Sequence, residues 1–216
     1  MEVGGVPVER FDVALGPLDL SLWRAAHLER FVDAAALLGA EAPPEPPYWM
    51  HLWPGALALA RRVAVEPRVG PGRRVLELGC GLGLPALAAA RRGAHVVACD
   101  WRREPLAVVA RSAADNGVAI RCVQMDWGAP ALAGGFDLCL GADIGYDTAA
   151  AATLAGALAH VLRPGGVAWL ADSVNTARTD LADALRARGF ALAVDETQER
   201  EDGRPVWIRV IEARRP

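Results

Sequence analysis

Three closely spaced glycines follow an apolar segment near the middle of the chain. The sequence GCGLG occupies residues 79–83, directly after Val75–Leu78 and before a stretch rich in alanine and leucine. Glycine lets the backbone approach a ligand where a Cβ would clash, and the start of a helix offers free N–H groups. We therefore predict a ligand-binding loop at a strand-to-helix junction, and its contacting residues are expected to be Gly79, Cys80, Gly81 and Gly83.

The spacing of these glycines disfavours a dinucleotide as the ligand. The dinucleotide fingerprint has glycines at offsets zero, two and five, whereas offset five is Leu84 here and the third glycine comes one place earlier, at Gly83. Glu77 precedes the first glycine by two residues, and its carboxylate would repel a diphosphate. The loop is therefore predicted to bind a cationic cofactor, with Glu77 in the site.

Acidic and aromatic residues stand at the ends of the next two strand-like segments. Asp100 ends the first, where a carboxylate can accept hydrogen bonds from ribose hydroxyls. Asp126 ends the second and could accept from an adenine amino group, while Trp101 and Trp127 offer flat faces to the base. Because the carboxyl ends of parallel strands meet at one edge of a sheet, we expect these residues to form one adenosine-binding site.

The elements that must position these residues alternate between strands and helices, which is typical of an α/β fold with a parallel sheet. The predicted strands are Val75–Leu78, His95–Asp100, Ile120–Asp126, Phe136–Gly141 and Val167–Ala171. The predicted helices between them are Leu84–Arg92, Glu104–Asn116, Ala149–Leu162 and Thr176–Arg188. Two final strand-like segments, Phe190–Thr197 and Val206–Ala213, are joined by a turn at residues 201–204 without a helix, so they must be antiparallel.

The first part of the chain is predicted to cap the sheet with helices. Residues Leu20–Leu38 have the apolar spacing of an amphipathic helix. The proline-rich residues 42–47 follow as an extended connector, because proline fixes φ and removes backbone donors. A further helix is expected from Pro54 to about Val65, since proline is favoured in a first helical turn.

The composition indicates one compact domain that is soluble and cytoplasmic. Of the 216 residues, 53% are hydrophobic, which is enough to fill a core that we expect to include Trp169 and Trp207. The net charge is −3 and no segment concentrates arginine, so we expect no nucleic-acid partner. No uncharged stretch reaches membrane-spanning length, so no membrane association is expected. The four cysteines stand singly in apolar runs, which predicts no metal site.

Three further segments, taken with the glycine loop and Asp100, resemble a known family. They are PPYWMHLWPG at residues 46–55, DNG at residues 115–117 and GADIGY at residues 141–146. From about residue 48 to its end the chain resembles the family 16 seven-β-strand methyltransferases, many of which methylate protein lysines. Within that family it is similar to the branch that includes the electron-transfer-flavoprotein β-subunit lysine methyltransferases.

The resemblance implies a Rossmann-like, seven-stranded sheet of order 3-2-1-4-5-7-6 with the last strand antiparallel and helices on both faces. It implies S-adenosylmethionine as the cofactor, with Trp53 near its methionine end and Ala142 in the same site. Asp143 and Tyr146 match the family's acidic-x-x-Tyr motif and are expected to be catalytic. Asp143 would accept a hydrogen bond from the incoming amine, and Tyr146 would shape the acceptor channel.

Two positions depart from the family pattern. Gly145 stands where a bulky apolar residue is usual, which predicts a wider acceptor pocket or a less firmly held Tyr146. Pro85 stands where a small glycine is common, and proline is tolerated there because the position falls in the first helical turn.

We expect a protein-lysine N-methyltransferase, with residues 1–53 as a helical cap and connector and residues 54–216 as the S-adenosylmethionine-dependent methyltransferase domain. Two alternatives stay open. The methyl acceptor could be a small molecule, because a fold does not fix a function. The chain could also be a nucleotide-cofactor binding protein without transferase activity, or an oxidoreductase that uses the same site.

Overall fold

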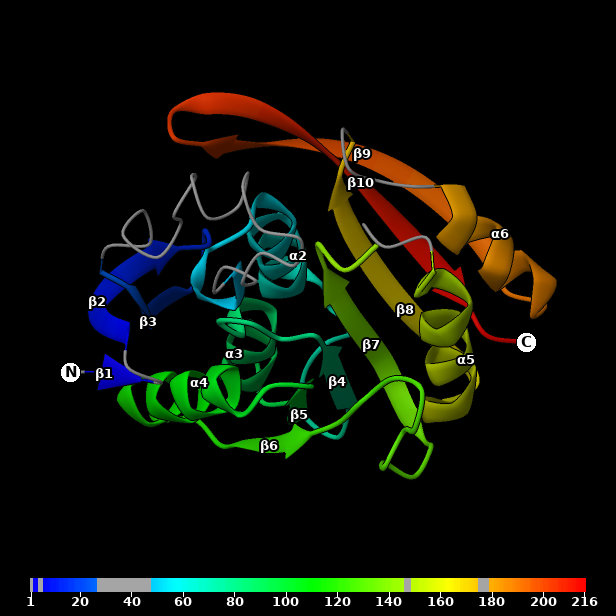
Figure 1. Ribbon diagram of the computed structural model, residues 1–216, viewed down its shortest axis with the longest axis horizontal. Helices are drawn as coiled ribbons and strands as arrows, with labels where there is room; N and C mark the ends of the chain where they lie inside the picture. Colours follow the sequence, from blue (N-terminus) through cyan, green and yellow to red (C-terminus); the bar gives the residue numbers. More distant parts are fainter. Residues whose placement is uncertain (1, 4–5, 27–47, 146–148, 175–178) are drawn as a thin grey trace, which may run out of the picture.

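A seven-stranded sheet forms the centre of the computed structural model, which describes residues 2–3, 6–26, 48–145, 149–174 and 179–216 (Figure 1). The strands lie in the order β6-β5-β4-β7-β8-β10-β9, which is the order 3-2-1-4-5-7-6 that the resemblance implies. Their bounds are β4 (Arg74–Leu78), β5 (His95–Asp100), β6 (Ile120–Gln124), β7 (Phe136–Ala142), β8 (Leu162–Ser173), β9 (Ala191–Glu201) and β10 (Arg204–Arg214).

The strand directions also agree with the prediction. Strands β6, β5, β4, β7 and β8 are parallel, whereas β10 runs antiparallel to both β8 and β9. The central strands are apolar at successive positions because helices cover both of their faces. Parallel pairing brings the ends of β4, β5 and β7 to one edge of the sheet, where the glycine loop follows β4.

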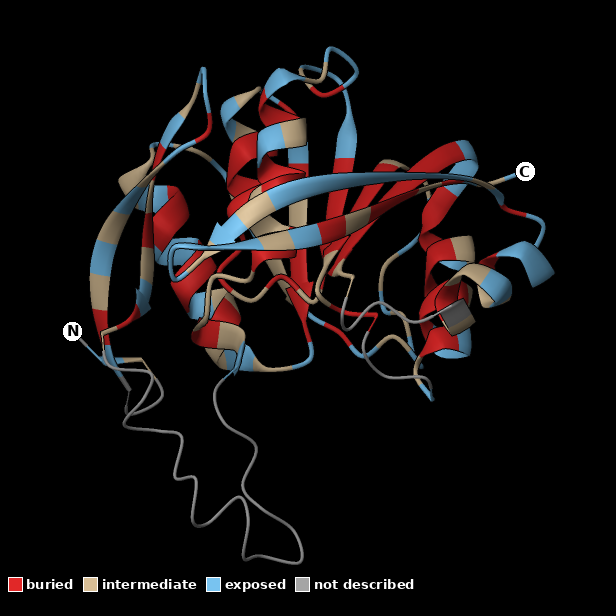
Figure 2. Ribbon diagram, turned by 90° about the horizontal axis from the view of Figure 1, so that it is seen from above, coloured by how far each residue is buried: buried red, intermediate tan, exposed pale blue. Residues whose placement is uncertain are grey.

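Helices pack on both faces of this sheet (Figure 1). α2 (Pro54–Val65), α3 (Leu84–Arg91) and α4 (Arg103–Asp115) share one apolar cluster with strand residues such as Val75 and Ala98. α5 (Ala151–Val161) and α6 (Thr179–Ala187) share a second cluster with residues such as Leu76 and Cys99. Since side chains alternate between the faces of a strand, neighbouring residues belong to different clusters. Figure 2 shows both buried layers against the sheet.

From Pro54 onward the predicted helices agree with the observed ones to within a few residues, and α2 has the predicted bounds. Pro85 lies in the first turn of α3, as expected. No helix in the described ranges is both long and apolar enough to cross a bilayer.

The two tryptophans predicted to lie in the core behave differently. Trp169 on β8 is 1% exposed, as expected, but the prediction for Trp207 is wrong because this side chain is 55% exposed. The β9–β10 hairpin extends past the end of β8, whose pairing with β10 stops at Ser173 opposite Ile208. Trp207 lies beyond that point and is paired with Gln198 of β9 but not with β8.

The N-terminal residues form a small sheet, and the predicted helix over Leu20–Leu38 is wrong in its first part. β1 (Glu2–Val3), β2 (Val6–Ala14) and β3 (Asp19–Ala25) form a three-stranded antiparallel sheet. Along β3 the alternating residues Leu20 and Leu22 are buried. The rest of the predicted helix and the proline-rich connector lie outside the described residues, and the division of the chain at residue 54 stays a prediction.

The side chain of Asn116 fastens the N-terminal sheet to the end of α4. Its Oδ1 accepts the backbone N–H of Ser21 at 3.0 Å, and its Nδ2 donates to the carbonyl of Ser21 at 2.6 Å. The neighbouring Trp23 donates its indole N–H to Asp115 at 2.8 Å and its backbone N–H to Ser112 at 3.2 Å. The Asn116 amide thus bonds both backbone polar groups of Ser21, as the backbone of a neighbouring strand would.

Replacing Asn116 with alanine is expected to loosen this sheet without unfolding the main sheet. The change leaves the backbone N–H and C=O of Ser21 without these partners, which destabilises by roughly 1–3 kcal/mol. Hydrogen exchange should accelerate at the β2 and β3 amides and stay unchanged in β4 and β7. Gln198→Ala removes an exposed amide on β9 and is the matched control. Unchanged hydrogen exchange at the β3 amides in the Asn116 variant would contradict the stabilising role given to Asn116.

Candidate active site

The glycine loop follows β4 in a left-handed backbone that brings it against two other segments. Gly79 has φ of 60° and Gly81 has φ of 48°, values that favour glycine. A Cβ on Gly79 would lie 2.9 Å from Cγ2 of Ile144, and one on Gly81 would lie 3.2 Å from the carbonyl oxygen of Trp49. Space as well as conformation therefore requires these two glycines.

Asp100 binds the glycine loop from the end of β5. One of its carboxylate oxygens accepts the backbone N–H of Gly81 at 3.2 Å, and the other accepts the N–H of Arg102 at 3.0 Å. The side chain is 6% exposed, and burial raises its pKa while the backbone donors lower it. An ionised carboxylate has about four acceptor positions, so Asp100 keeps capacity for hydroxyl donors after holding the loop.

Glu77 lies on β4 and is almost fully buried, with its side chain reaching the start of α3. Its Oε2 accepts the backbone N–H of Ala86 at 2.8 Å, within the first turn of the helix. Burial raises the pKa of Glu77 to about 8, and the nearby charge of Asp100 adds to this, although the hydrogen bond from Ala86 acts in the opposite direction. The structure thus gives Glu77 a capping contact that the sequence did not predict, and its contact with a cofactor stays a prediction.

The raised pKa of Glu77 predicts that the protein loses stability as pH rises. A carboxyl group whose pKa is higher in the folded than in the unfolded chain stabilises fully below the unfolded value, near 4.5, and this contribution disappears as pH rises through about 8. Between pH 6 and pH 9 the free energy of unfolding should fall by roughly 2–3 kcal/mol through this group. Urea unfolding should show that the free energy of unfolding falls less over this pH range in Glu77→Gln than in wild type. Equal falls in the two proteins would contradict the raised pKa of Glu77.

The residues expected around the adenine occupy different environments. The Trp127 ring lies beside Gly79, 3.4 Å from the position of a Cβ on that residue. Asp126 is exposed and accepts the backbone N–H of Gly128 at 2.7 Å. Trp101 is 60% exposed, with the guanidinium of Arg102 at 4.9 Å from its ring centre. Trp127 is thus beside the loop, while Asp126 and Trp101 lie at the surface.

Asp143 follows β7 and packs against the start of α2. Its φ is 53°, and its backbone N–H donates to the carbonyl of Ala171 at 2.7 Å. A Cβ on Gly55 would overlap Oδ2 of Asp143, so glycine is required at that helical position. Burial first, and then the charge of Asp172, raise the pKa of Asp143 to about 7, while backbone donors at Ser173, Gly55 and Ala56 lower it.

Oδ2 of Asp143 is buried and has no hydrogen-bond partner among the described residues. Ala142 ends β7 immediately before it. Ile144, immediately after it, contacts the glycine loop at Gly79. Ile144 therefore connects Asp143, its neighbour in the chain, to the glycine loop that Asp100 bonds. Tyr146, the other expected catalytic residue, lies outside the described residues.

Trp53 precedes α2 and belongs to a small aromatic group. Its indole N–H donates to the carbonyl of Tyr48 at 3.0 Å, and its ring stands edge-on to His51 at 4.7 Å between centres. His51 in turn bonds to Glu201 on β9 at 3.0 Å. These contacts hold the segment before α2 next to the β9–β10 hairpin.

Two residues that the sequence did not single out also belong to the site. Asp172, at the end of β8, is 6% exposed and its charge acts on Asp143. Trp49 has its carbonyl against Gly81 and a buried indole nitrogen with no partner in the described part of the chain. Asp172 could have been found by the rule that identified Asp100, since it is a carboxylate at the carboxyl end of a parallel strand.

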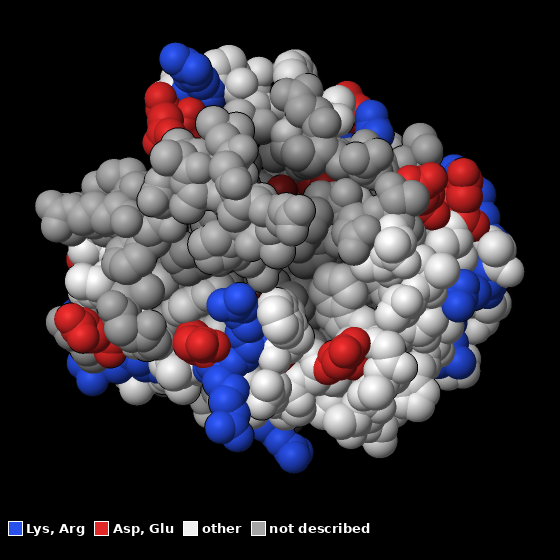
Figure 3. All heavy atoms as spheres, viewed as in Figure 1, with Lys and Arg blue, Asp and Glu red and all other residues white. Residues whose placement is uncertain are grey.

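The surface around the site carries both signs of charge. In Figure 3 the described Arg, Asp and Glu side chains are interspersed around the rim of this face, and acidic atoms lie at the bottom of a central hollow. Among the described residues, no three His, Cys, Asp or Glu side chains gather as a metal site.

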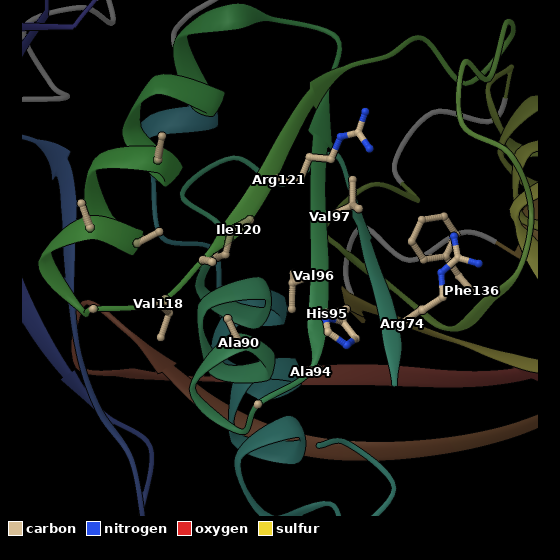
Figure 4. A pocket seen from close by; sticks show the side chains of 16 residues that line it. Arg74, Ala90, Ala94, His95, Val96, Val97, Val118, Ile120, Arg121 and Phe136 are labelled. Atoms are coloured by element: carbon tan, nitrogen blue, oxygen red, sulfur yellow. The ribbon is translucent and has the colours of Figure 1, made fainter. Parts of the chain in front are cut away.

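A cavity of about 850 Å³ lies elsewhere, at the amino ends of the strands. Its lining includes Arg74, His95 and Ile120, which begin β4, β5 and β6, and small residues from the ends of α3 and α4 (Figure 4). None of the predicted site residues lines it. The candidate site is therefore at the opposite edge of the sheet from this cavity.

Comparison with known proteins agrees with this geometry. Residues 75–166 match the family model described as a methyltransferase domain. The electron transfer flavoprotein beta subunit lysine methyltransferase of Danio rerio is 42% identical over 109 residues, which cover 49% of this chain and 41% of that protein. Histone-arginine methyltransferase METTL23 of Rattus norvegicus is 37% identical over 84 residues, covering 38% of this chain and 37% of that protein. The chain thus aligns with less than half of the length of these relatives.

A solved structure supports the fold over nearly the whole chain. The T. thermophilus 16S rRNA N2 G1207 methyltransferase, in complex with AdoMet and guanosine, superposes with a TM-score of 0.66 at 19% identity. The superposition covers 97% of this chain and 51% of that one. Residues 75–166 thus resemble a methyltransferase domain, and the chain has the Rossmann-like fold of that solved methyltransferase. Among methyltransferases it resembles the electron-transfer-flavoprotein β-subunit lysine methyltransferases.

Proposed function

We propose that this chain is an S-adenosylmethionine-dependent methyltransferase that methylates a nitrogen of a protein side chain, with the lysine amine as the first candidate. The observation that carries the proposal is the joining of two sets of groups through Ile144. Its side chain contacts the glycine loop, which Asp100 bonds, and its backbone directly follows Asp143, whose carboxyl is buried. Similarity to lysine and arginine methyltransferases of proteins supports a nitrogen acceptor.

The residues present fit the cofactor. Gly79 and Gly81 are partly exposed and have no side chain, so a ligand can approach the backbone of the loop, and Asp100 offers acceptors for ribose hydroxyls. Trp49, whose backbone lies against Gly81, has a buried indole N–H that lacks an acceptor among the described residues. Asp100 supplies negative charge beside the loop, and a cationic ligand would favour the ionised form of Glu77, which suits a ligand carrying a sulfonium and an ammonium group. When bound, S-adenosylmethionine supplies a methyl group activated by positively charged sulfur.

Asp143 would orient the acceptor nitrogen and take its proton. A lysine amine has an unperturbed pKa near 10.4 and must lose a proton before its lone pair can attack. Asp143, with a pKa of about 7, is partly ionised at neutral pH and can accept that proton. The remaining contribution of the protein is to hold the nitrogen in line with the departing sulfur at near-attack distance. Trp53, in the aromatic group before α2, would help to exclude water from the acceptor.

Calorimetry tests which cofactor binds, and labelling tests which kind of molecule receives the methyl group. S-adenosylmethionine and its demethylated product should bind, and tight binding of NAD alone would overturn the proposal. Purified protein should then transfer label from S-adenosylmethionine to discrete protein bands of a cell extract. Label confined to the low-mass fraction would instead assign a small-molecule acceptor. Amino-acid analysis of a labelled band separates methyl-lysine from methyl-arginine.

A further inference from the structure

Asp172 accepts hydrogen bonds from the turn that carries Asp143. It lies at the end of β8, and its Oδ1 accepts the backbone N–H of Gly145 at 2.8 Å. The backbone N–H of Ile144 also bonds to this carboxylate. Two successive amides of the turn after β7 therefore point at one buried side chain from the neighbouring strand.

Gly145 and Asp172 fit together so closely that any side chain at 145 would displace the Asp172 carboxylate. A Cβ on Gly145 would lie 2.7 Å from Oδ2 and 3.1 Å from Cγ of Asp172. Gly145 is not among the residues with positive φ, so its backbone conformation does not require glycine. The requirement is space, and the Asp172 carboxylate takes the place of the bulky residue usual at 145 in the family that the sequence resembles.

The same two strands hold Asp143 in its unusual conformation. Asp143, with φ of 53°, donates its backbone N–H to Ala171, the residue before Asp172. A left-handed backbone at a residue other than glycine persists only where its surroundings fix it. The turn is thus bonded to β8 on both sides of Ile144, through Ala171 and through Asp172.

We propose that Asp172 is a positioning residue of the acceptor site, whose carboxylate fills the space beside Gly145 and holds the turn that presents Asp143. The proposal rests on the proposed function only in calling this the acceptor site. Asp143 is faced by Asp172 from β8, by the backbone of Ser173, and by the first amides of α2. On β9, Glu199 and Glu201 are engaged with Arg61 and His51 respectively.

A double-mutant cycle tests the steric pairing. Gly145→Ala and Asp172→Ala should each lower the melting temperature by at least about 3 °C, the first by a clash and the second by loss of two hydrogen bonds. Their combination should be clearly more stable than the sum of the two losses predicts, because truncating the Asp172 side chain leaves room for a Cβ at 145. Strictly additive losses would overturn the pairing. Asp172→Asn keeps an acceptor for Gly145 and should melt close to wild type.

Titration of Asp143 separates positioning from a purely structural role. The carboxyl ¹³C signal of Asp143, assigned by its loss in Asp143→Asn, should titrate at lower pH in Asp172→Asn by about one pH unit or more, because the neighbouring charge is gone. Asp183→Asn, at an exposed position on α6, should leave the midpoint unchanged. An unchanged midpoint in Asp172→Asn would contradict the proposal. The measurement needs neither cofactor nor acceptor, so it fails or succeeds independently of the proposed function.

Discussion

Replacing Asp143 with asparagine is expected to lower turnover by roughly 10²–10⁴-fold while leaving affinity for the demethylated cofactor within a few fold. Asparagine keeps the shape of the side chain against Gly55, but it cannot take a proton from the acceptor nitrogen. Asp143 packs on Gly55 and bonds to Ala171, whereas the glycine loop is bonded by Asp100, so the loss of Asp143 should change chemistry and not cofactor binding. Single-turnover rates with labelled cofactor, and calorimetry on the same preparation, measure the two quantities separately.

The proposed role of Asp143 also predicts how the activity of the wild-type enzyme depends on pH. The ionised form of Asp143 is the active one, so kcat/KM should fall as pH decreases through about 7. That limb should be absent from the residual activity of Asp143→Asn. Asp183→Asn is the control, because it removes an exposed carboxylate from α6. Full activity in the Asp143 variant, with an unchanged melting temperature, would remove this residue from the mechanism.

Replacing Asp100 with asparagine is expected to weaken binding of S-adenosylmethionine by roughly 10–150-fold, the equivalent of a lost charge-assisted hydrogen bond of about 1.5–3 kcal/mol. Asp100 holds Gly81 and is placed to receive the ribose hydroxyls, so the change affects both the loop and its ligand. Calorimetry with the demethylated cofactor measures the same loss without turnover.

The control for Asp100 is again Asp183→Asn, which should bind as wild type does. Asparagine can still accept the N–H of Gly81 through its oxygen, so the loop should keep its conformation, and circular dichroism checks this. Affinity equal to wild type in the Asp100 variant would show that the cofactor lies elsewhere.

The main sheet could be predicted because its signals are local. Each central strand is a short apolar run, and each helix has its own apolar spacing, so β5 and α2 have the predicted bounds. The final hairpin was also predictable, since two strand-like segments joined by a tight turn must pair antiparallel.

The N-terminal sheet could not be predicted from its own residues. Leu22 and Ala25 fit helical spacing as well as they fit alternation, and the alternation of Leu20 with Leu22 extends over few residues. The stabilising contact comes from Asn116, which bonds to the backbone of Ser21 on β3 and is 95 positions away in sequence. Tertiary contacts of this kind override local propensity.

Part of the candidate site follows from the sequence, and part depends on packing. The sequence indicates Gly81 and Asp100, and the structure bonds them to each other. It gives no sign that Glu77 caps α3 or that Asp143 packs on Gly55. The first contact depends on how the glycine loop turns between β4 and α3, and the second joins elements distant along the chain. The glycine at 145 was recognised as a departure, but its reason is a side chain from β8.

A crystal structure with the demethylated cofactor tests the central claim most directly. The ligand should lie over Gly79 and Gly81, with both ribose hydroxyls within hydrogen-bond distance of Asp100 and its sulfur facing the side of the site that holds Asp143. A ligand bound at the cavity beside Arg74 and His95, or the absence of any bound ligand at saturating concentration, would contradict the account.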